Sequence, residues 1–388
     1  MRLLLVGMPA SIHMARWAAG AVAAGLEVGL FPSDGAPANP AFANVTIFRP
    51  TPDGRYRPPA GVKVVPAPGM LRGVPTALGR AASLAAVIKA FRPDIVHAQE
   101  IQHGGHLAAR AKGMLRNAPP LVLTIWGSDI SLQSRIPAER ARIMRTLRQV
   151  DVLTGDCERD LWQARRMGYT GETAMAMPVA GGFDLDRLAP LRVAGPVSAR
   201  RTIVVKGYQH WAGRAQVAFR AIELCGSTLA GFHLAVHSVR PDEEVLAGHA
   251  AKAAGMELEV IGRLQRPVEH DDILRLHGRA RISLGLSISD GISTGLLEAM
   301  VMGSFPIQSD TACASEWILP GESGLIVPPE DPGAVARALR AAATDDVLVD
   351  RAALINSETV RARLDAHVVQ QRVFSLYERT VSGAIARG

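Results

Sequence analysis

Residues suited to binding a ligand are concentrated in segment 286–303. There an apolar run leads into a glycine-containing loop and then into a helical pattern. After Gly291, the first backbone N–H groups of that helix lack partners within it, and the helix dipole favours a bound phosphate there. The amides concerned are those of Ile292, Ser293 and Thr294. We therefore expect a diphosphate to bind at this loop.

Two carboxylates flank the expected phosphate site, with seven residues between them. Glu298 lies about one turn into the helix, where a carboxylate can accept hydrogen bonds from ribose hydroxyls. Asp290 precedes the turn and would point at a sugar. A lone D-x7-E pair also arises by chance, so the prediction depends on its setting between a strand and a helix.

Two cations earlier in the chain fit the same ligand. Lys206 ends an apolar strand pattern, and Arg214 comes near the start of the next helix. A departing nucleoside diphosphate gains negative charge, which a positioned Lys and Arg stabilise without a metal. The alternative for each is an ordinary surface cation, but only five of the 43 basic residues are Lys, which makes Lys206 conspicuous.

Expected strands and helices alternate along the whole chain and would position these residues. Fourteen short apolar runs, eight before residue 178 and six after residue 200, are separated by helical patterns, which is typical of parallel sheets covered by helices. A stretch rich in Pro and Gly divides the two series. We predict two Rossmann-like, doubly wound α/β domains facing a cleft, with residues 1–195 on the acceptor side and 196–365 binding the donor. The helix 366–388 would pack back on the first domain. Ligands of such sheets bind beyond the carboxyl ends of the strands.

With these segments in order, the chain resembles the retaining GT-B glycosyltransferases of family four, whose E-x7-E motif has the placement of Asp290 and Glu298. Further segments with a family appearance begin at Ser11, Pro93, Trp126, Ile261 and Gly321. The resemblance implies that Asp290 contacts the donor sugar and Glu298 the ribose, with Lys206 and Arg214 on the diphosphate. It also implies a donor-binding role for Arg263. Asp290 stands where the family has Glu. Lys206 and Arg214 stand where the family has Arg and Lys, respectively.

On the acceptor side, Trp126 stands where many family members have a histidine that contacts the reacting sugar. Because an indole cannot accept a proton, polar contacts would have to come from neighbouring residues, and the sequence does not choose among them. The candidates are Ser11, His13, Arg16, His97, His103, His106 and Asp129. For His97 the alternative is a buried structural histidine. The D-x-D pair Asp184 and Asp186 is expected to form turns or caps, and no metal site is predicted.

Composition limits the possible partners. The net charge is +7, but the excess is mostly Arg, and no basic run is interleaved with aromatics as in a single-strand binding platform, so nucleic acid is not expected. The helix near 137–149 carries Arg142, Arg145 and Arg148 on one face, either as a solvated surface or as a contact with anionic lipid. No span of about twenty apolar residues is present. Three separated cysteines favour a cytoplasmic location, at the inner face of the membrane if that contact forms.

We therefore expect an enzyme that moves a hexose from a nucleotide-sugar donor to a glycan or lipid-linked acceptor with retention of configuration, in cell-surface polysaccharide or glycoconjugate synthesis. No cofactor is expected, because the nucleotide sugar is a substrate. The alternatives are a sugar-nucleotide epimerase of the same fold and a non-catalytic protein that binds sugar nucleotides.

Overall fold

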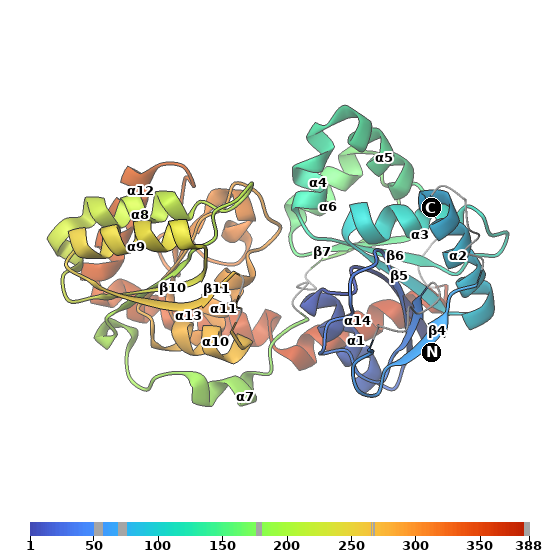
Figure 1. Ribbon diagram of the computed structural model, residues 1–388, viewed down its shortest axis with the longest axis horizontal. Coiled ribbons are helices and arrows are strands. Elements are labelled where there is room, and N and C mark those ends of the chain that lie inside the picture. Colours follow the sequence, from blue (N-terminus) through green and yellow to red (C-terminus); the bar gives the residue numbers. More distant parts are fainter. Residues whose placement is uncertain (50–56, 69–75, 176–180, 265, 267, 384–388) are drawn as a thin grey trace. The chain divides into compact units, whose positions relative to one another are not determined.

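The computed structural model describes residues 1–49, 57–68, 76–175, 181–264, 266 and 268–383 (Figure 1). Contacts divide the chain into unit 1, Met1–Gly182 with Val369–Gly388, and unit 2, Phe183–Val368. The sequence placed the division after residue 195, whereas residues 183–195 lie in unit 2. Phe183 N donates to Leu364 O at 2.8 Å, and Val193 N donates to Gly278 O at 3.1 Å, which holds this stretch to unit 2.

Unit 1 contains an eight-stranded sheet in the order β4-β3-β2-β1-β5-β6-β7-β8, in which neighbouring strands are parallel. Its strands are β1 Arg2–Gly7, β2 Glu27–Pro32, β3 Thr46–Arg49, β4 Lys63–Pro66, β5 Ile95–Gln99, β6 Leu121–Ile125, β7 Val152–Gly155 and β8 Glu172–Met175. Its helices include α1 Ile12–Ala23, α2 Thr76–Phe91, the π-helix η1 Glu100–Gly105, α3 His106–Lys112, α4 Ser128–Ser131, α5 Pro137–Leu147, α6 Glu158–Arg166 and α14 Ala366–Val381.

The central strands of unit 1, such as β1, β5, β6 and β7, are buried on both faces, as the near-continuous apolar runs predict. Successive residues of β1 alternate between two cores, Leu4 and Val6 facing α2, α3, α5 and α6, and Leu3 and Leu5 facing α1 and α14. The C-terminal helix α14 thus covers the same face as α1, and Tyr377 is fully buried there.

Unit 2 contains a six-stranded parallel sheet in the order β11-β10-β9-β12-β13-β14. Its strands are β9 Thr202–Lys206, β10 His233–Val239, β11 Glu257–Arg263, β12 Ile282–Gly285, β13 Phe305–Ser309 and β14 Leu325–Val327. Its helices include α7 Leu185–Leu188, α8 Ala215–Cys225, α9 Pro241–Ala253, α10 His270–Arg279, α11 Thr294–Met302, α12 Pro332–Thr344 and α13 Asp346–Arg363.

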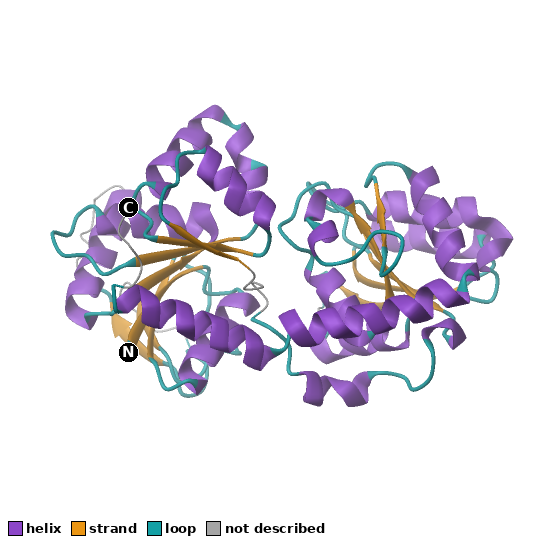
Figure 2. Ribbon diagram, turned by 180° about the vertical axis from the view of Figure 1, so that it is seen from behind, coloured by secondary structure: helices purple, strands orange, loops and turns teal. Residues whose placement is uncertain are grey.

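Helices lie on both sides of the strands in each unit (Figure 2). In unit 2, Ile203 and Val205 of β9 face the core formed with α8, α9, α12 and α13, while Val204 packs toward α10. The predicted class, two α/β domains with doubly wound parallel sheets, is therefore confirmed.

Candidate functional site

The carboxyl edge of the unit 2 sheet holds the predicted donor residues. Strand order reverses between β9 and β12, and open parallel sheets bind ligands at such a point. The loops that follow these strands are hydrogen-bonded to each other: Arg214 N donates to Leu286 O at 3.0 Å, and Ile288 N donates to Ala212 O at 2.9 Å. The Ser309 hydroxyl, at the end of β13, accepts from the N–H of Ser287 at 3.0 Å. The site loops are therefore fixed by the fold.

The loop after β9 can close only because residue 213 is glycine. A Cβ on Gly213 would lie 2.0 Å from Tyr208 O, which no side chain tolerates. The tight turn brings Tyr208 back over the end of β9, and the Lys206 Nζ lies 4.7 Å from the centre of the Tyr208 ring. Lys206 ends β9, the position predicted from the sequence, and its side chain is exposed.

Arg214 organises this loop. Its Nη1 donates to the main-chain oxygens of Gly213, His210 and Ala212 at 3.0, 3.3 and 3.3 Å. Its Nε donates to Glu330 at 2.9 Å. The sequence placed Arg214 on the diphosphate. Its Nη1 is committed to the loop and its Nε to Glu330, so fewer of its five N–H donors are left for a ligand than that prediction supposed.

A third cation at this edge was missed. Arg240 follows β10, the strand beside β9, and its side chain is exposed, with no hydrogen bond or ion pair to any residue the structure describes. Burial lowers the pKa of His210, and the positive charges of Lys206, Arg240 and Arg214 lower it further. All three cations are therefore close enough to the His210 ring to affect its charge. Lys206 was identified by its place at the end of a strand pattern and by the rarity of Lys, and the second signal is absent for Arg240 because Arg is abundant in this chain.

Glu298 lies buried in α11, beside three histidines of unit 2. Its carboxylate is 2.6 Å from Nε2 of His270 and 3.8 Å from Nε2 of His277. Burial alone would raise the pKa of Glu298, but the hydrogen bond with His270 and the nearby His277 and His237 lower it to about 2. The carboxylate is therefore an ionised acceptor. These partners come from α10 and β10 and could not be found from spacing along the chain.

Lys206 acts on the same histidine cluster as Glu298. Burial lowers the pKa of His237 to about 3, and the positive charge of Lys206 contributes to the shift while Glu298 opposes it. His237 also faces Lys206 across the ladder between β10 and β9. The structure thus brings together a predicted cation and a predicted carboxylate that are 92 positions apart in the sequence.

The loop between β12 and α11 has the predicted setting, following a strand and leading into a helix. α11 begins at Thr294, and the Ser293 side chain at the N-cap makes no capping bond, so it does not occupy the first amides of the helix. Asp290 Oδ1 accepts from Gly291 N at 3.0 Å. Arg263 lies at the end of β11 and donates two bonds to Glu244, at 2.7 and 2.8 Å.

In unit 1, His97 is a structural residue rather than an acceptor contact. It is fully buried, and its Nδ1 and Nε2 lie 2.6 Å from the Tyr377 hydroxyl and 2.7 Å from Thr124 Oγ1. Because Trp17 Nε1 can only donate to that hydroxyl, at 2.8 Å, Tyr377 donates to Nδ1, and Nε2 donates to Thr124. Burial lowers the pKa of His97 to about 3, so the ring stays neutral.

Asp129 and His106 are also committed to the fold. Asp129 is buried and accepts from the N–H groups of Trp126 and Ile101, which ties the loop after β6 to η1. Burial and the nearby Glu100 raise the pKa of Asp129. His106 is buried, with Glu139 at 2.7 Å from Nε2. The two residues are therefore unsuited to contact an acceptor.

His103 is the candidate histidine that remains exposed. Glu100, whose φ is +64°, begins η1, and its carboxylate accepts from both N and Nδ1 of His103 at 2.6 Å. This bond raises the pKa of His103. π-helices and positive φ in non-glycine residues are frequent at functional sites. Neither feature has a signal in the sequence, and Glu100 was therefore not among the predicted residues.

The other unit 1 candidates lie around α1 and the loop after β6. Ser11 caps α1 by accepting from Met14 N at 3.4 Å. The His13 ring packs edge-on against Trp126, with 5.7 Å between centroids. The buried Nε1 of Trp126 has no partner among the described residues. Arg16 lies on α1 beside α14. In unit 2, Asp184 caps α7, in agreement with the turn or cap expected.

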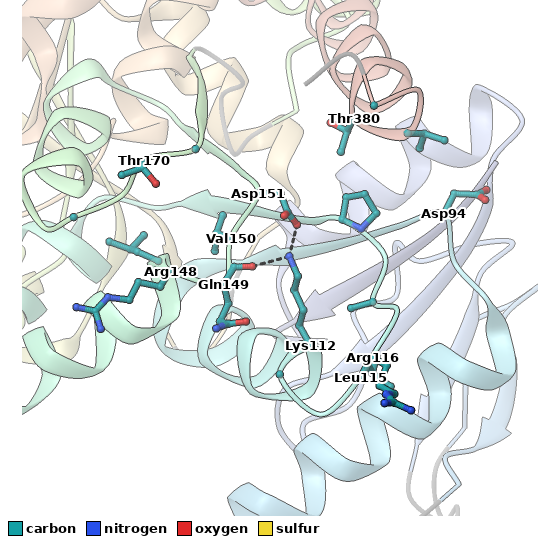
Figure 3. A pocket seen from close by; sticks show the side chains of 18 residues that line it. Asp94, Lys112, Leu115, Arg116, Arg148, Gln149, Val150, Asp151, Thr170 and Thr380 are labelled. Carbon is teal, nitrogen blue, oxygen red and sulfur yellow. Dashed lines mark hydrogen bonds and ion pairs between the residues drawn. The ribbon is translucent and has the colours of Figure 1, made fainter. Parts of the chain in front are cut away.

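A cavity of about 620 Å³ lies elsewhere, at the amino ends of the unit 1 strands (Figure 3). Lys112 projects into it and bonds Asp151 and the Gln149 carbonyl. Its walls come from the loops that precede β5, β6, β7 and β8 and from the end of α14. Because ligands of parallel sheets bind at the carboxyl edge, this cavity is not the candidate site.

Solved structures share this two-unit architecture, which defines the GT-B fold. Sucrose-phosphate synthase from Thermosynechococcus elongatus matches with a TM-score of 0.69 and 16% identity, covering 99% of this chain and 100% of that one. Anabaena HepE, solved with UDP-glucose, matches with a TM-score of 0.67 and 15% identity, covering 97% and 99%. A trehalose-6-phosphate synthase, solved in a study of glycosyltransfer with retention, matches with a TM-score of 0.70 and 14% identity, covering 98% and 99%.

Family comparisons agree with the fold. Residues 2–154 match the family "Glycosyl transferase 4-like", and residues 201–345 match "Glycosyl transferases group 1". The chain is thus a glycosyltransferase of the GT-B type. A search of curated proteins by sequence found no match.

Proposed function

We propose that this glycosyltransferase moves a hexose from a nucleotide-sugar donor to a glycan or lipid-linked acceptor, with retention of configuration and without a metal. The ionised, buried Glu298 at the point where the unit 2 strand order reverses carries this proposal. A carboxylate held ionised inside a protein is a strong acceptor for neighbouring hydroxyl groups, such as those of a ribose.

The donor residues have distinct roles. Glu298 accepts hydrogen bonds from the ribose, and an incoming hydroxyl replaces or shares the bond with His270. The amides of 292–294 bind the diphosphate at the start of α11. Lys206, with Arg240 and the remaining capacity of Arg214, stabilises the negative charge that grows on the diphosphate as the bond to the sugar breaks. Asp290 contacts the donor sugar.

The acceptor binds at the carboxyl edge of the unit 1 sheet. His13, the indole N–H of Trp126 and the exposed His103 offer polar groups to a hydroxyl acceptor there. Ser11 and Arg16 belong to the same region. The solved relatives support a sugar donor and retention, since HepE was solved with UDP-glucose and the trehalose-6-phosphate synthase was studied for transfer with retention. Synthesis of surface polysaccharide or glycoconjugates in the cytoplasm fits a chain whose three cysteines are buried and form no disulfide.

The test is a screen of nucleotide sugars for thermal stabilisation, followed by product analysis with a panel of glycan and lipid-linked acceptors. We expect one donor to raise the melting temperature and to yield a glycosylated acceptor with the anomeric configuration of the donor, determined by NMR. Conversion of the donor to another sugar nucleotide without an acceptor would identify an epimerase instead. Donor binding without turnover on any acceptor would favour a binding protein.

A further inference from the structure

The helices over one face of the unit 1 sheet carry a strong excess of exposed positive charge. Residues 106–168 contain eleven basic and six acidic residues, so most of the net charge of the chain arises here. Nine arginines of this stretch are exposed, against one exposed carboxylate, Glu158. The arginines are Arg110, Arg116, Arg135, Arg140, Arg142, Arg145, Arg148, Arg165 and Arg166. We call this set, on α3, α5, α6 and the loops between them, the arginine face.

The acidic residues of the same stretch other than Glu158 are buried or contact neighbouring side chains. Glu139 contacts His106 at 2.7 Å and Gln102 at 3.3 Å, and it pairs with Arg142 at 3.7 Å, while Asp151 pairs with Lys112. Asp129, Asp156 and Asp160 are buried. The positive charge of the arginine face is therefore left largely uncompensated at the surface, and it can attract an extended anionic partner.

A groove between α3 and α5 gives this face a place for anionic groups. Its volume is about 370 Å³, and Arg110, Arg142 and Arg145 line it. No carboxylate is among its lining residues. The Nε of Arg145 bonds only a carbonyl of its own helix, and Arg110 has no hydrogen bond or ion pair to the described part of the chain. Guanidinium groups in this arrangement suit phosphate oxygens.

Exposed apolar side chains accompany the arginines. Trp162 is 59% exposed, Ile136 54% and Met114 41%. The Arg166 guanidinium lies 4.7 Å from the centre of the Trp162 ring. The helices α3, α5 and α6 pack on one core and so lie on the same face of the sheet (Figure 1). Exposed Trp beside basic residues is typical of a surface that meets lipid headgroups and the acyl boundary.

We propose that the arginine face docks on a bilayer containing anionic phospholipids. The phosphodiester groups occupy the α3–α5 groove and its rim, and Trp162, Ile136 and Met114 enter the interfacial region. A bilayer fits better than a nucleic acid, because the exposed apolar residues are one aromatic and two aliphatic side chains rather than a series of stacking platforms. The proposal concerns unit 1 alone and does not depend on the donor site of unit 2. In the part of the chain that the structure describes, no helix is both long and apolar enough to cross a membrane.

The experiment is co-sedimentation of the full chain with phosphatidylcholine vesicles, with and without phosphatidylglycerol. We expect binding to the anionic vesicles only, weakened by added salt. The variant R110E/R142E/R145E should bind about a hundredfold more weakly, since each basic residue near an anionic surface contributes about a factor of five or more. The control R220E/R337E/R351E makes the same charge change on exposed residues of unit 2 and should bind within about twofold of the unaltered protein.

Two further measurements keep the result interpretable. Both triple variants should retain the melting temperature and the nucleoside diphosphate affinity of the unaltered protein, so failure of the membrane contact stays distinct from failure of the donor site.

Trp162→Ala should weaken vesicle binding several-fold. Equal binding by the two triple variants, or no preference for phosphatidylglycerol, overturns the proposal. So does tighter binding to single-stranded RNA, or saturation by free glycerol 3-phosphate in place of vesicles.

Discussion

Arg214 and Arg240 are the same residue type at the same sheet edge, but their surroundings give them different tasks. Arg214 donates to three carbonyls of its own loop and to Glu330, while Arg240 is exposed and without a partner among the described residues. Arg240→Ala should therefore weaken nucleoside diphosphate binding about tenfold, the loss of roughly one charge-assisted bond, and leave the melting temperature unchanged. Titration calorimetry with UDP, GDP and ADP measures this.

Arg214→Ala should behave in the opposite way, because it releases the loop after β9. We expect a lower melting temperature, by several degrees, along with weaker nucleotide binding. Arg201→Ala serves as the control for both variants, since Arg201 directly precedes β9, at the opposite edge of the same sheet. Identical melting temperatures for Arg214→Ala and Arg240→Ala would contradict the distinction.

At the scale of elements, helix α14 is tied to unit 1 by a directed chain of hydrogen bonds. Trp17 donates to Tyr377, and Tyr377 donates to His97. Tyr377→Phe removes the shared hydroxyl and leaves two buried polar atoms without a partner, which costs about 1 to 3 kcal/mol each at most. The free energy of unfolding of unit 1, measured with urea, should fall by an amount of this order. Ser382→Ala, which removes an exposed hydroxyl near the end of the same helix, should change nothing; a similar loss in that variant would count against the account.

The regular elements were the most predictable part of the fold. Buried parallel strands such as β1 and β6 leave continuous apolar runs, and Asp331 followed by Pro332 marks the start of α12 in the sequence. The π-helix η1 and the positive φ of Glu100 leave no such signal, because part of what holds this segment is the distant Asp129, which accepts from Ile101 N. The division at Gly182 was missed for a similar reason, since contacts with distant residues decide it.

At the scale of the whole molecule, buried neutral histidines in both units make stability depend on pH. Burial lowers the folded-state pKa of His97 and of His237 to about 3, below the ordinary value of 6.5 in an unfolded chain. The unfolded state therefore binds more protons between pH 6.5 and 3, so stability is full above pH 6.5 and falls as the pH drops through this range. Each histidine contributes about 1.4 kcal/mol per pH unit.

Urea unfolding at pH 7, 6 and 5 checks this slope. His97→Gln should reduce the pH dependence of the unfolding free energy of unit 1 by the contribution of about one proton. That of unit 2 should stay unchanged, because His97 belongs to unit 1 and His237 to unit 2. A slope that is the same in the variant and the unaltered protein would show that His97 is protonated in the fold.

The candidate site was predictable where chemistry coincides with the end of a strand or the start of a helix. Lys206 and Glu298 were found this way, and the structure places both beside His237. Interactions that join distant segments were not predictable. The histidines around Glu298 come from β10 and α10, and the arginine face gathers charge from three helices and the loops between them. Sequence analysis identified only the part of that face on α5.

The central claim is that Glu298 and Lys206 bind the ribose and the diphosphate of a nucleotide-sugar donor. Titration calorimetry with UDP, GDP and ADP on the full chain, beside Glu298→Ala and Lys206→Ala, tests it most directly. The account predicts that the unaltered protein binds one of these nucleotides and that each variant binds it at least about tenfold more weakly. Equal affinity in the variants, or no binding of any nucleotide by the unaltered protein, would contradict it.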